Sequence, residues 1–211
     1  MTIEVNLNGA HPVSVRIESR IFDPAAERRI ESLLKSVWSH IHPNDQIAIA
    51  RHWNNSQTSM PKVAAADPWW DDFWTDGMCE DEGRLIWLNW TTNRLMPDDV
   101  VEATLAHEMA HTWQWAIGKD RFALTNDDLA GTIIAIKYFK RASVVGRVEL
   151  HADETILRWG YDPLHSVLWK ERHLKPSAKD KKWTLRKKPL QVERSRKRAS
   201  KKQTDAYYLK D

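Results

Sequence analysis

The sequence is poor in cysteine and has no long apolar run. Its 211 residues include one cysteine, Cys79, so neither an intrachain disulfide nor a zinc knuckle built on cysteines can form. No stretch approaches the roughly 20 apolar residues that a membrane-spanning helix requires. The first residues, MTIEVNLNGA, lack the basic start and the apolar run of a secretory signal. We therefore expect a cytoplasmic protein that does not associate with a membrane.

The small net charge of +3 hides an uneven distribution. Residues 166–211 contain 16 Lys and Arg against 5 Asp and Glu, whereas residues 1–165 contain 16 against 24. An acidic body is therefore followed by a basic segment. From about Pro176 on, charged residues are many and apolar residues few. We predict one folded domain over residues 1–175 and a disordered basic tail over residues 176–211.

Apolar periodicity and capping signals predict an α+β fold. Residues 3–7 and 13–17 alternate apolar and polar side chains on either side of an Asn-Gly turn, as in a β-hairpin. Asp23 and Pro24 are typical of a helix start, and helical spacing of apolar residues then continues to Ile41. We further expect strands at 46–53 and 84–90, with a long irregular segment between them, and helices at about 98–117 (ending before Gly118), 126–140, 144–159 and after Pro163.

The motif that carries chemistry is HEMAH at 107–111, inside the helix expected at 98–117. At about 3.6 residues per turn, His107 and His111 are one turn apart on the same face, so both imidazoles can reach one ion. Glu108 lies beside them, close enough to accept a proton from a water on that ion. This spacing serves peptide hydrolysis by zinc, with the glutamate as general base. The motif indicates a zinc-dependent peptidase in which Glu108 is catalytic.

The surroundings of the motif favour this interpretation over two incidental histidines on a surface helix. An apolar stripe runs beside the motif at four-residue spacing, so one side of the helix can pack in a core while the histidines face another way. The stripe consists of Val101, Leu105, Met109 and Trp113.

A catalytic zinc has three protein ligands and one open position, so a third ligand is needed. The best candidate is Glu149, in RVELHADE at 147–154. Asp153, four residues later on the same helical face, could accept the outer N–H of a ligating histidine. Alternatively, Glu149 and Asp153 are two acids on a solvated face. His151 is the rival ligand, and it lies about 200° around the helix from Glu149, so the two cannot face one ion together.

Residues 83–115, GRLIWLNWTTNRLMPDDVVEATLAHEMAHTWQW, resemble the strand, connector and active-site helix of zincin metallopeptidases. They are most similar to the SprT-like proteins and to minimal zincins of the ImmA/IrrE type. SprT-like proteins usually supply a third histidine, whereas the Glu149/Asp153 pair resembles the gluzincin E-x-x-x-D pattern. The resemblance implies an α+β zincin-like core with a small sheet, an active-site helix and a helical second half. It also implies zinc held by His107 and His111, with Glu108 as general base.

These observations predict a zinc peptidase that acts on protein or peptide substrates. The basic tail includes Trp183 among Lys and Arg clusters, a composition that can bind nucleic acid through phosphates and stacking. Activity associated with DNA would be consistent with the SprT-like resemblance. A solubilising tail is the plainer interpretation. The alternative function is a nucleic-acid-binding or scaffolding protein whose zinc site is structural or vestigial, although such a site needs no general base.

Overall fold

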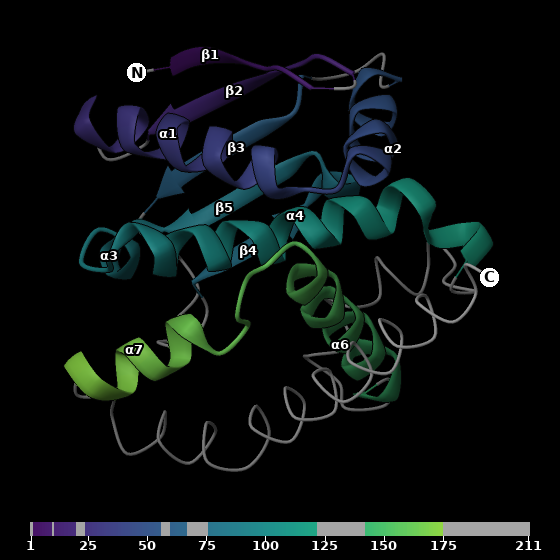
Figure 1. The fold of residues 1–211 in the computed structure, drawn as a ribbon. Coiled ribbons are helices and arrows are strands. Elements are labelled where there is room, and N and C mark those ends of the chain that lie inside the picture. Colours follow the sequence, from purple (N-terminus) through teal and green to yellow (C-terminus); the bar gives the residue numbers. More distant parts are fainter. Residues whose placement is uncertain are drawn as a thin grey trace, which may run out of the picture.

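The computed structural model describes residues 2–9, 11–19, 24–55, 60–66, 76–121 and 142–174. This part of the chain has an α+β architecture in which helices pack on a small mixed sheet (Figure 1). The predicted helix at 126–140 and the predicted tail at 176–211 lie outside the described residues. The elements are β1 (Thr2–Leu7), β2 (Val13–Ser19), α1 (Pro24–His40), α2 (Pro43–Asn54), β3 (Lys62–Ala66), β4 (Gly77–Glu80), a 3-10 turn (Asp81–Gly83), β5 (Leu85–Asn89), α3 (Trp90–Asn93), α4 (Asp98–Arg121), α6 (Ala142–Arg158) and α7 (His165–His173).

The sheet has five strands in the order β1-β2-β3-β5-β4 within the described ranges. The predicted hairpin is confirmed, with β1 antiparallel to β2 and Val5 opposite Val15. β3 runs parallel to both β2 and β5, and β4 returns antiparallel to β5 with Cys79 opposite Ile86. β4 is therefore an edge strand, and its outer side has no strand partner in the described sheet.

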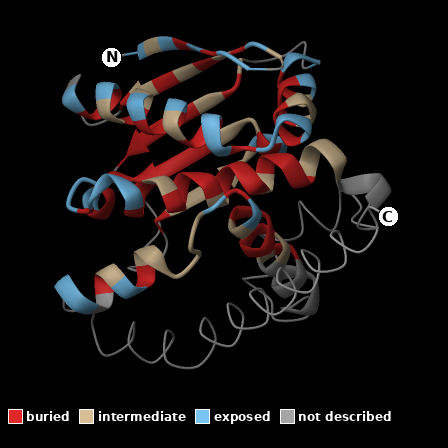
Figure 2. Cartoon of the chain, viewed as in Figure 1, coloured by how far each residue is buried: buried red, intermediate tan, exposed pale blue. Residues whose placement is uncertain are grey.

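Helices α1 and α4 lie side by side on one face of the sheet, and α6 and α7 lie on the far side of α4 (Figure 1). The buried residues gather where the two helices meet the strands (Figure 2). Strand β3 contributes to both faces: Val63 and Ala65 belong to this main core, while Ala64 packs with Trp87 in a smaller cluster on the opposite face. None of the helices in the described ranges is both long enough and apolar enough to cross a bilayer.

The prediction of a strand at 46–53 is wrong, because these residues form most of helix α2. The alternation of Ile47 and Ile49 suggested a strand, but the buried side chains follow helical spacing instead, with Gln46, Ile49 and Trp53 all buried. The helix start also carried a signal: Pro43 occupies the first turn, and the His42 side chain accepts a hydrogen bond from the Asn44 N–H.

Two strands, β3 and β4, lie within the segment that was predicted to be irregular. β3 reads KVAAA, and alanine has a low strand propensity. Its neighbours β2 and β5 are both parallel to it, and a strand buried on both faces shows no alternation to detect. Helix α4 also continues through Gly118 to Arg121, so that glycine does not end the helix as predicted.

Candidate metal centre

Helix α4 presents apolar side chains to the main core and two histidines to helix α6. The predicted apolar stripe is confirmed: Val101, Leu105 and Met109 are fully buried, and Trp113 is almost so, all within the main core. The two histidines of HEMAH lie on the side that meets α6, where both approach Glu149. The core therefore fixes the rotation of α4 and points the histidines at α6.

Three donor groups from α4 and α6 converge at this contact. His107 Nε2 lies 3.2 Å from His111 Nε2 and 3.2 Å from Glu149 Oε2. His111 Nε2 lies 3.7 Å from Glu149 Oε1. Within the described residues, these three side chains are the one group of His, Cys, Asp or Glu whose ligand atoms lie close enough to share an ion, all within 4.8 Å of one another.

The spacing of these donors fits zinc. Two ligands bound at about 2.0–2.1 Å in tetrahedral geometry lie about 3.3 Å apart. The two 3.2 Å separations are close to that value, and the 3.7 Å separation needs a small rotation of the carboxylate. Two imidazoles and one carboxylate are also a donor set typical of zinc enzymes. All three groups keep some exposure, from 13% for His111 to 35% for Glu149, so solvent reaches the group.

The outer nitrogen of His107 faces a carboxylate from α6. His107 Nδ1 lies 3.2 Å from Asp153 Oδ1, the position expected for a partner that orients a ligating imidazole. Burial of His107 disfavours the imidazolium, but the hydrogen bonds to Asp153 and Glu149 outweigh burial and raise the pKa of His107 well above its ordinary value. The imidazole is thus held between two carboxylates.

The outer nitrogen of His111 faces an amide that the sequence interpretation overlooked. His111 Nδ1 lies 2.8 Å from Gln114 Oε1, three residues along the same helix. Such i, i+3 neighbours share a helix face, so the spacing in HEMAHTWQ was the available signal. His151, the rival third ligand, points elsewhere: its Nδ1 lies 3.0 Å from Gln114 Nε2, and its ring stacks on Trp113 at 5.3 Å between centroids. The structure thus places Glu149, not His151, on the histidine pair.

Glu108 packs against strand β4. Its side chain is only 6% exposed, and a Cβ atom added at Gly77 would lie 2.7 Å from Glu108 Cγ and 2.9 Å from Oε1. Any side chain at position 77 would therefore collide with the carboxylate, so glycine allows the edge strand to approach it. Glu108 therefore lies between helix α4 and the edge strand of the described sheet.

The turn between β4 and β5 is anchored on α4 beside the motif. Thr112 Oγ1 donates to the Gly83 carbonyl at 2.9 Å, and Trp53 Nε1 donates to the same oxygen at 2.8 Å. Gly83 has φ +82°, and an added Cβ would lie 2.9 Å from the Thr112 backbone, so both the conformation and the close approach require glycine. These contacts fix one end of β4 along the helix.

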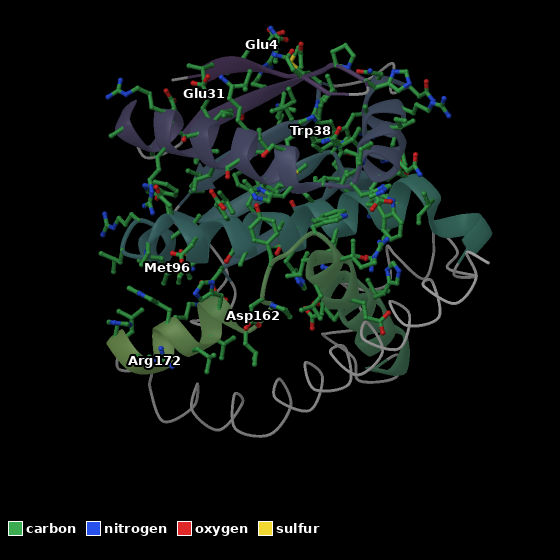
Figure 3. The ribbon with its side chains drawn as sticks, viewed as in Figure 1. Glu4, Glu31, Trp38, Met96, Asp162 and Arg172 are labelled. Carbon is green, nitrogen blue, oxygen red and sulfur yellow. The ribbon has the colours of Figure 1, made fainter. Side chains whose placement is uncertain are left out.

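The other end of β4 is anchored by a buried ion pair with α7. The Asp76 carboxylate pairs with Lys170, whose side chain is fully buried, and it also accepts a hydrogen bond from Thr92 Oγ1 at 3.2 Å. The Asp76 carbonyl accepts from Asn93 Nδ2 at 2.7 Å. Helix α7, marked by Arg172, lies below the start of α4, which follows Met96 (Figure 3). Helix α7 thus fixes the residue that precedes Gly77.

Other reactive side chains near the helix have different partners. Cys79 Sγ lies 3.8 Å from Thr112 Oγ1, and burial together with the nearby Glu108 charge raises the pKa of the thiol well above its ordinary value, as expected for an inert cysteine. Tyr161 Oη lies 3.2 Å from His40 Nδ1, and His165 Nε2 lies 3.4 Å from Asp99 Oδ2.

Comparison with known proteins gives no relative. No protein-family model, no curated protein and no solved structure matches this chain.

Proposed function

We propose that this protein is a zinc-dependent peptidase. The observation that supports this most directly is the convergence of His107 Nε2, His111 Nε2 and a Glu149 carboxylate oxygen within 4.8 Å of one another. The same helix places Glu108 one residue from the first of these donors, and β4 packs against that glutamate. His107, His111 and Glu149 would hold a zinc ion, which would supply a Lewis acid able to polarise a peptide carbonyl and activate water.

Glu108 is the proposed proton carrier. It would accept the proton of the attacking water and deliver it to the departing amine of the cleaved peptide bond. Gly77 lies against this carboxylate so closely that no side chain would fit at position 77. Asp153 and Gln114 orient the outer nitrogens of the two histidines, so that both Nε2 atoms point to the same place.

An extended polypeptide is the substrate class that the neighbouring surface favours. β4 lies at the edge of the described sheet, beside the residues of the metal centre. A free strand edge presents N–H and C=O groups that can pair with an added strand, and main-chain pairing of this kind accepts many sequences. We propose that a substrate segment pairs with β4 and thereby passes its peptide bonds in front of Glu108.

A purely structural zinc site is less consistent with this geometry. Structural zinc is usually enclosed by four protein ligands, whereas the group found in the described residues offers three and keeps partial exposure. A structural site also has no use for a buried carboxylate beside its ligands. Glu108 occupies that place.

The test compares Glu108→Gln with the unmodified protein. We expect Glu108→Gln to keep one zinc per chain and to lose cleavage of an unstructured protein such as casein by about 10²–10⁴-fold, because only the proton acceptor is removed. Glu27→Gln is the matched control, since Glu27 is also buried but lies on α1. Full cleavage by Glu108→Gln, or unmodified protein that carries no stoichiometric zinc, would contradict the proposal.

A further inference from the structure

Gln114 connects the second proposed ligand to the helix that carries the third. Its side chain is fully buried between α4 and α6. Its Oε1 lies 2.8 Å from His111 Nδ1. Its Nε2 donates to the backbone carbonyl of Val148 at 2.7 Å and lies 3.0 Å from His151 Nδ1. One amide thus contacts both helices.

The Val148 carbonyl determines which way this amide points. A backbone carbonyl can only accept a hydrogen bond, so the Gln114 atom that lies 2.7 Å from it must be the NH₂ nitrogen. The other amide atom, which faces His111, must then be the oxygen, and an amide oxygen can only accept. His111 Nδ1 is therefore the donor and carries the proton. In the neutral imidazole, Nε2 is left with a lone pair, which is the form that a metal requires.

We propose that Gln114 is a positioning residue that sets the tautomer of His111 before zinc arrives. The Val148 carbonyl, which orients the Gln114 amide, belongs to α6, the helix that also carries Glu149. This inference rests on the proposed function, since it concerns the same metal centre. With the opposite tautomer, an N–H group would point toward His107 and Glu149, where the ion is expected, and the proton would have to move before binding.

The same amide explains why His151 is not a ligand. The second Gln114 N–H points to His151 Nδ1, so this nitrogen accepts and His151 carries its proton on Nε2. The His151 ring is nearly parallel to Trp113, with 12° between their planes. His151 therefore completes the hydrogen bonding of Gln114 and belongs to the bridge between the helices.

This arrangement predicts that a carboxylate cannot replace the amide. A carboxylate beside a ligating histidine usually strengthens metal binding. At position 114, however, Gln114→Glu would bring a second acceptor against the Val148 carbonyl and would remove the donor that faces His151. We therefore expect Gln114→Glu to weaken the site, in contrast to the favourable role of Asp153 beside His107.

The direct test is the tautomer of His111 in the metal-free, full-length protein. Long-range ¹H–¹⁵N correlation spectra at mildly alkaline pH distinguish Nδ1–H from Nε2–H imidazoles, and the peaks of His111 are identified by their loss in His111→Asn. We expect the Nδ1–H form for His111 and the Nε2–H form for His151. An Nε2–H form or a rapidly exchanging mixture at His111 would overturn the proposal, and no Gln114 variant needs to fold for this reading.

The second test of the role of Gln114 is zinc affinity, measured by competition with a chelating dye. We expect Gln114→Met and Gln114→Glu each to bind zinc about 10–100-fold more weakly than the unmodified protein. Gln46→Met is the matched control, because Gln46 is also buried and donates to a backbone carbonyl, that of Trp38, on helices away from the metal centre. Gln114→Glu binding zinc as tightly as the unmodified protein would overturn the proposal. If the unmodified protein binds no zinc, the proposed function fails, and the spectra still decide the tautomer.

Discussion

The two sides of helix α4 differ in how tightly chemistry constrains them. On one side, Leu105 and Met109 are fully buried against the sheet. Packing of this kind is not directional, and other apolar side chains of similar volume can serve. On the other side, His107 and His111 each contact named atoms on both ring nitrogens. Hydrogen bonds and metal ligation are directional, so few substitutions are compatible with that side.

The comparison suggests a division of roles. The apolar side should determine the stability of the fold, and the polar side should determine metal affinity. Substitutions chosen from each side should therefore change one property and spare the other.

The largest effect is expected at the third ligand. Glu149→Ala should weaken zinc binding by more than about 100-fold, beyond the range for outer-sphere partners, because it removes a ligand atom. His151→Ala should change zinc affinity by less than about tenfold, since His151 contacts Gln114 and Trp113 instead of the histidine pair. Asp153→Ala should lie between them, with a loss of about 10–100-fold. Competition with a chelating dye measures all three.

A larger loss of zinc affinity in His151→Ala than in Glu149→Ala would contradict the assignment of Glu149 as the third ligand. If His151→Ala strips the metal while Glu149→Ala retains it, the site uses three histidines, as the SprT-like resemblance would have it. Circular dichroism of each variant serves as the control for folding.

The next effect concerns the apolar side. Leu105→Ala should lower the free energy of unfolding by about 2–5 kcal/mol, because it leaves a cavity in the core. Leu95→Ala should change it by less than about 0.5 kcal/mol, since Leu95 is 56% exposed. Urea unfolding should be measured with a chelator present, because bound zinc would add its own stabilisation.

The zinc affinity of Leu105→Ala tests whether the apolar side of α4 also affects metal binding. Folded Leu105→Ala should bind zinc as the unmodified protein does. A large loss of zinc affinity with little loss of stability would show that the two sides of α4 are not separable.

The smallest effect is a proton released on zinc binding. Because the pKa of His107 is raised in the metal-free protein, its imidazole keeps a second proton to higher pH than an ordinary histidine does, and zinc must displace that proton. The apparent zinc affinity should therefore rise with pH until the pH passes this raised pKa. Calorimetry in buffers of different ionisation enthalpy measures the release. Asp153→Asn removes one of the carboxylates that raise the pKa of His107, so it should reduce the number of protons released on zinc binding.

The raised pKa of His107 also makes the stability of the metal-free protein depend on pH. A raised pKa means that the folded metal-free protein holds the proton more tightly than the unfolded chain does. His107 therefore contributes stability that is complete below the ordinary histidine pKa and is lost as pH rises through the raised value. A metal-free protein that releases no proton on binding zinc just above the ordinary histidine pKa would show that the two carboxylates do not raise the pKa of His107.

The sequence predicted those features that depend on local spacing. The apolar stripe of α4 and the HEMAH spacing follow from helical periodicity, and the structure brings His107, His111 and Glu149 together. Asp153 shares a face of α6 with Glu149 and lies beside His107, because a four-residue step along one helix is also local. The N-terminal hairpin was found for the same reason, from alternation around a turn.

Features that depend on contacts between distant segments were not predictable in this way. The approach of Gly77 to Glu108 arises from the position of β4 in the sheet, and nothing in GMCE indicates a strand beside α4. The buried pair of Asp76 and Lys170 joins residues far apart in the chain. The hydrogen bond from Gln114 to the Val148 carbonyl involves a main-chain atom, and the sequence of side chains gives no indication of such a bond.

The most direct test of the proposed metal centre is anomalous X-ray scattering at the zinc edge, from crystals of the full-length protein grown with zinc. We expect one anomalous peak per chain, bonded to His107 Nε2, His111 Nε2 and a Glu149 carboxylate oxygen, with Glu108 beside it but not coordinated. A peak coordinated by His151 in place of Glu149, or no peak between α4 and α6, would contradict it.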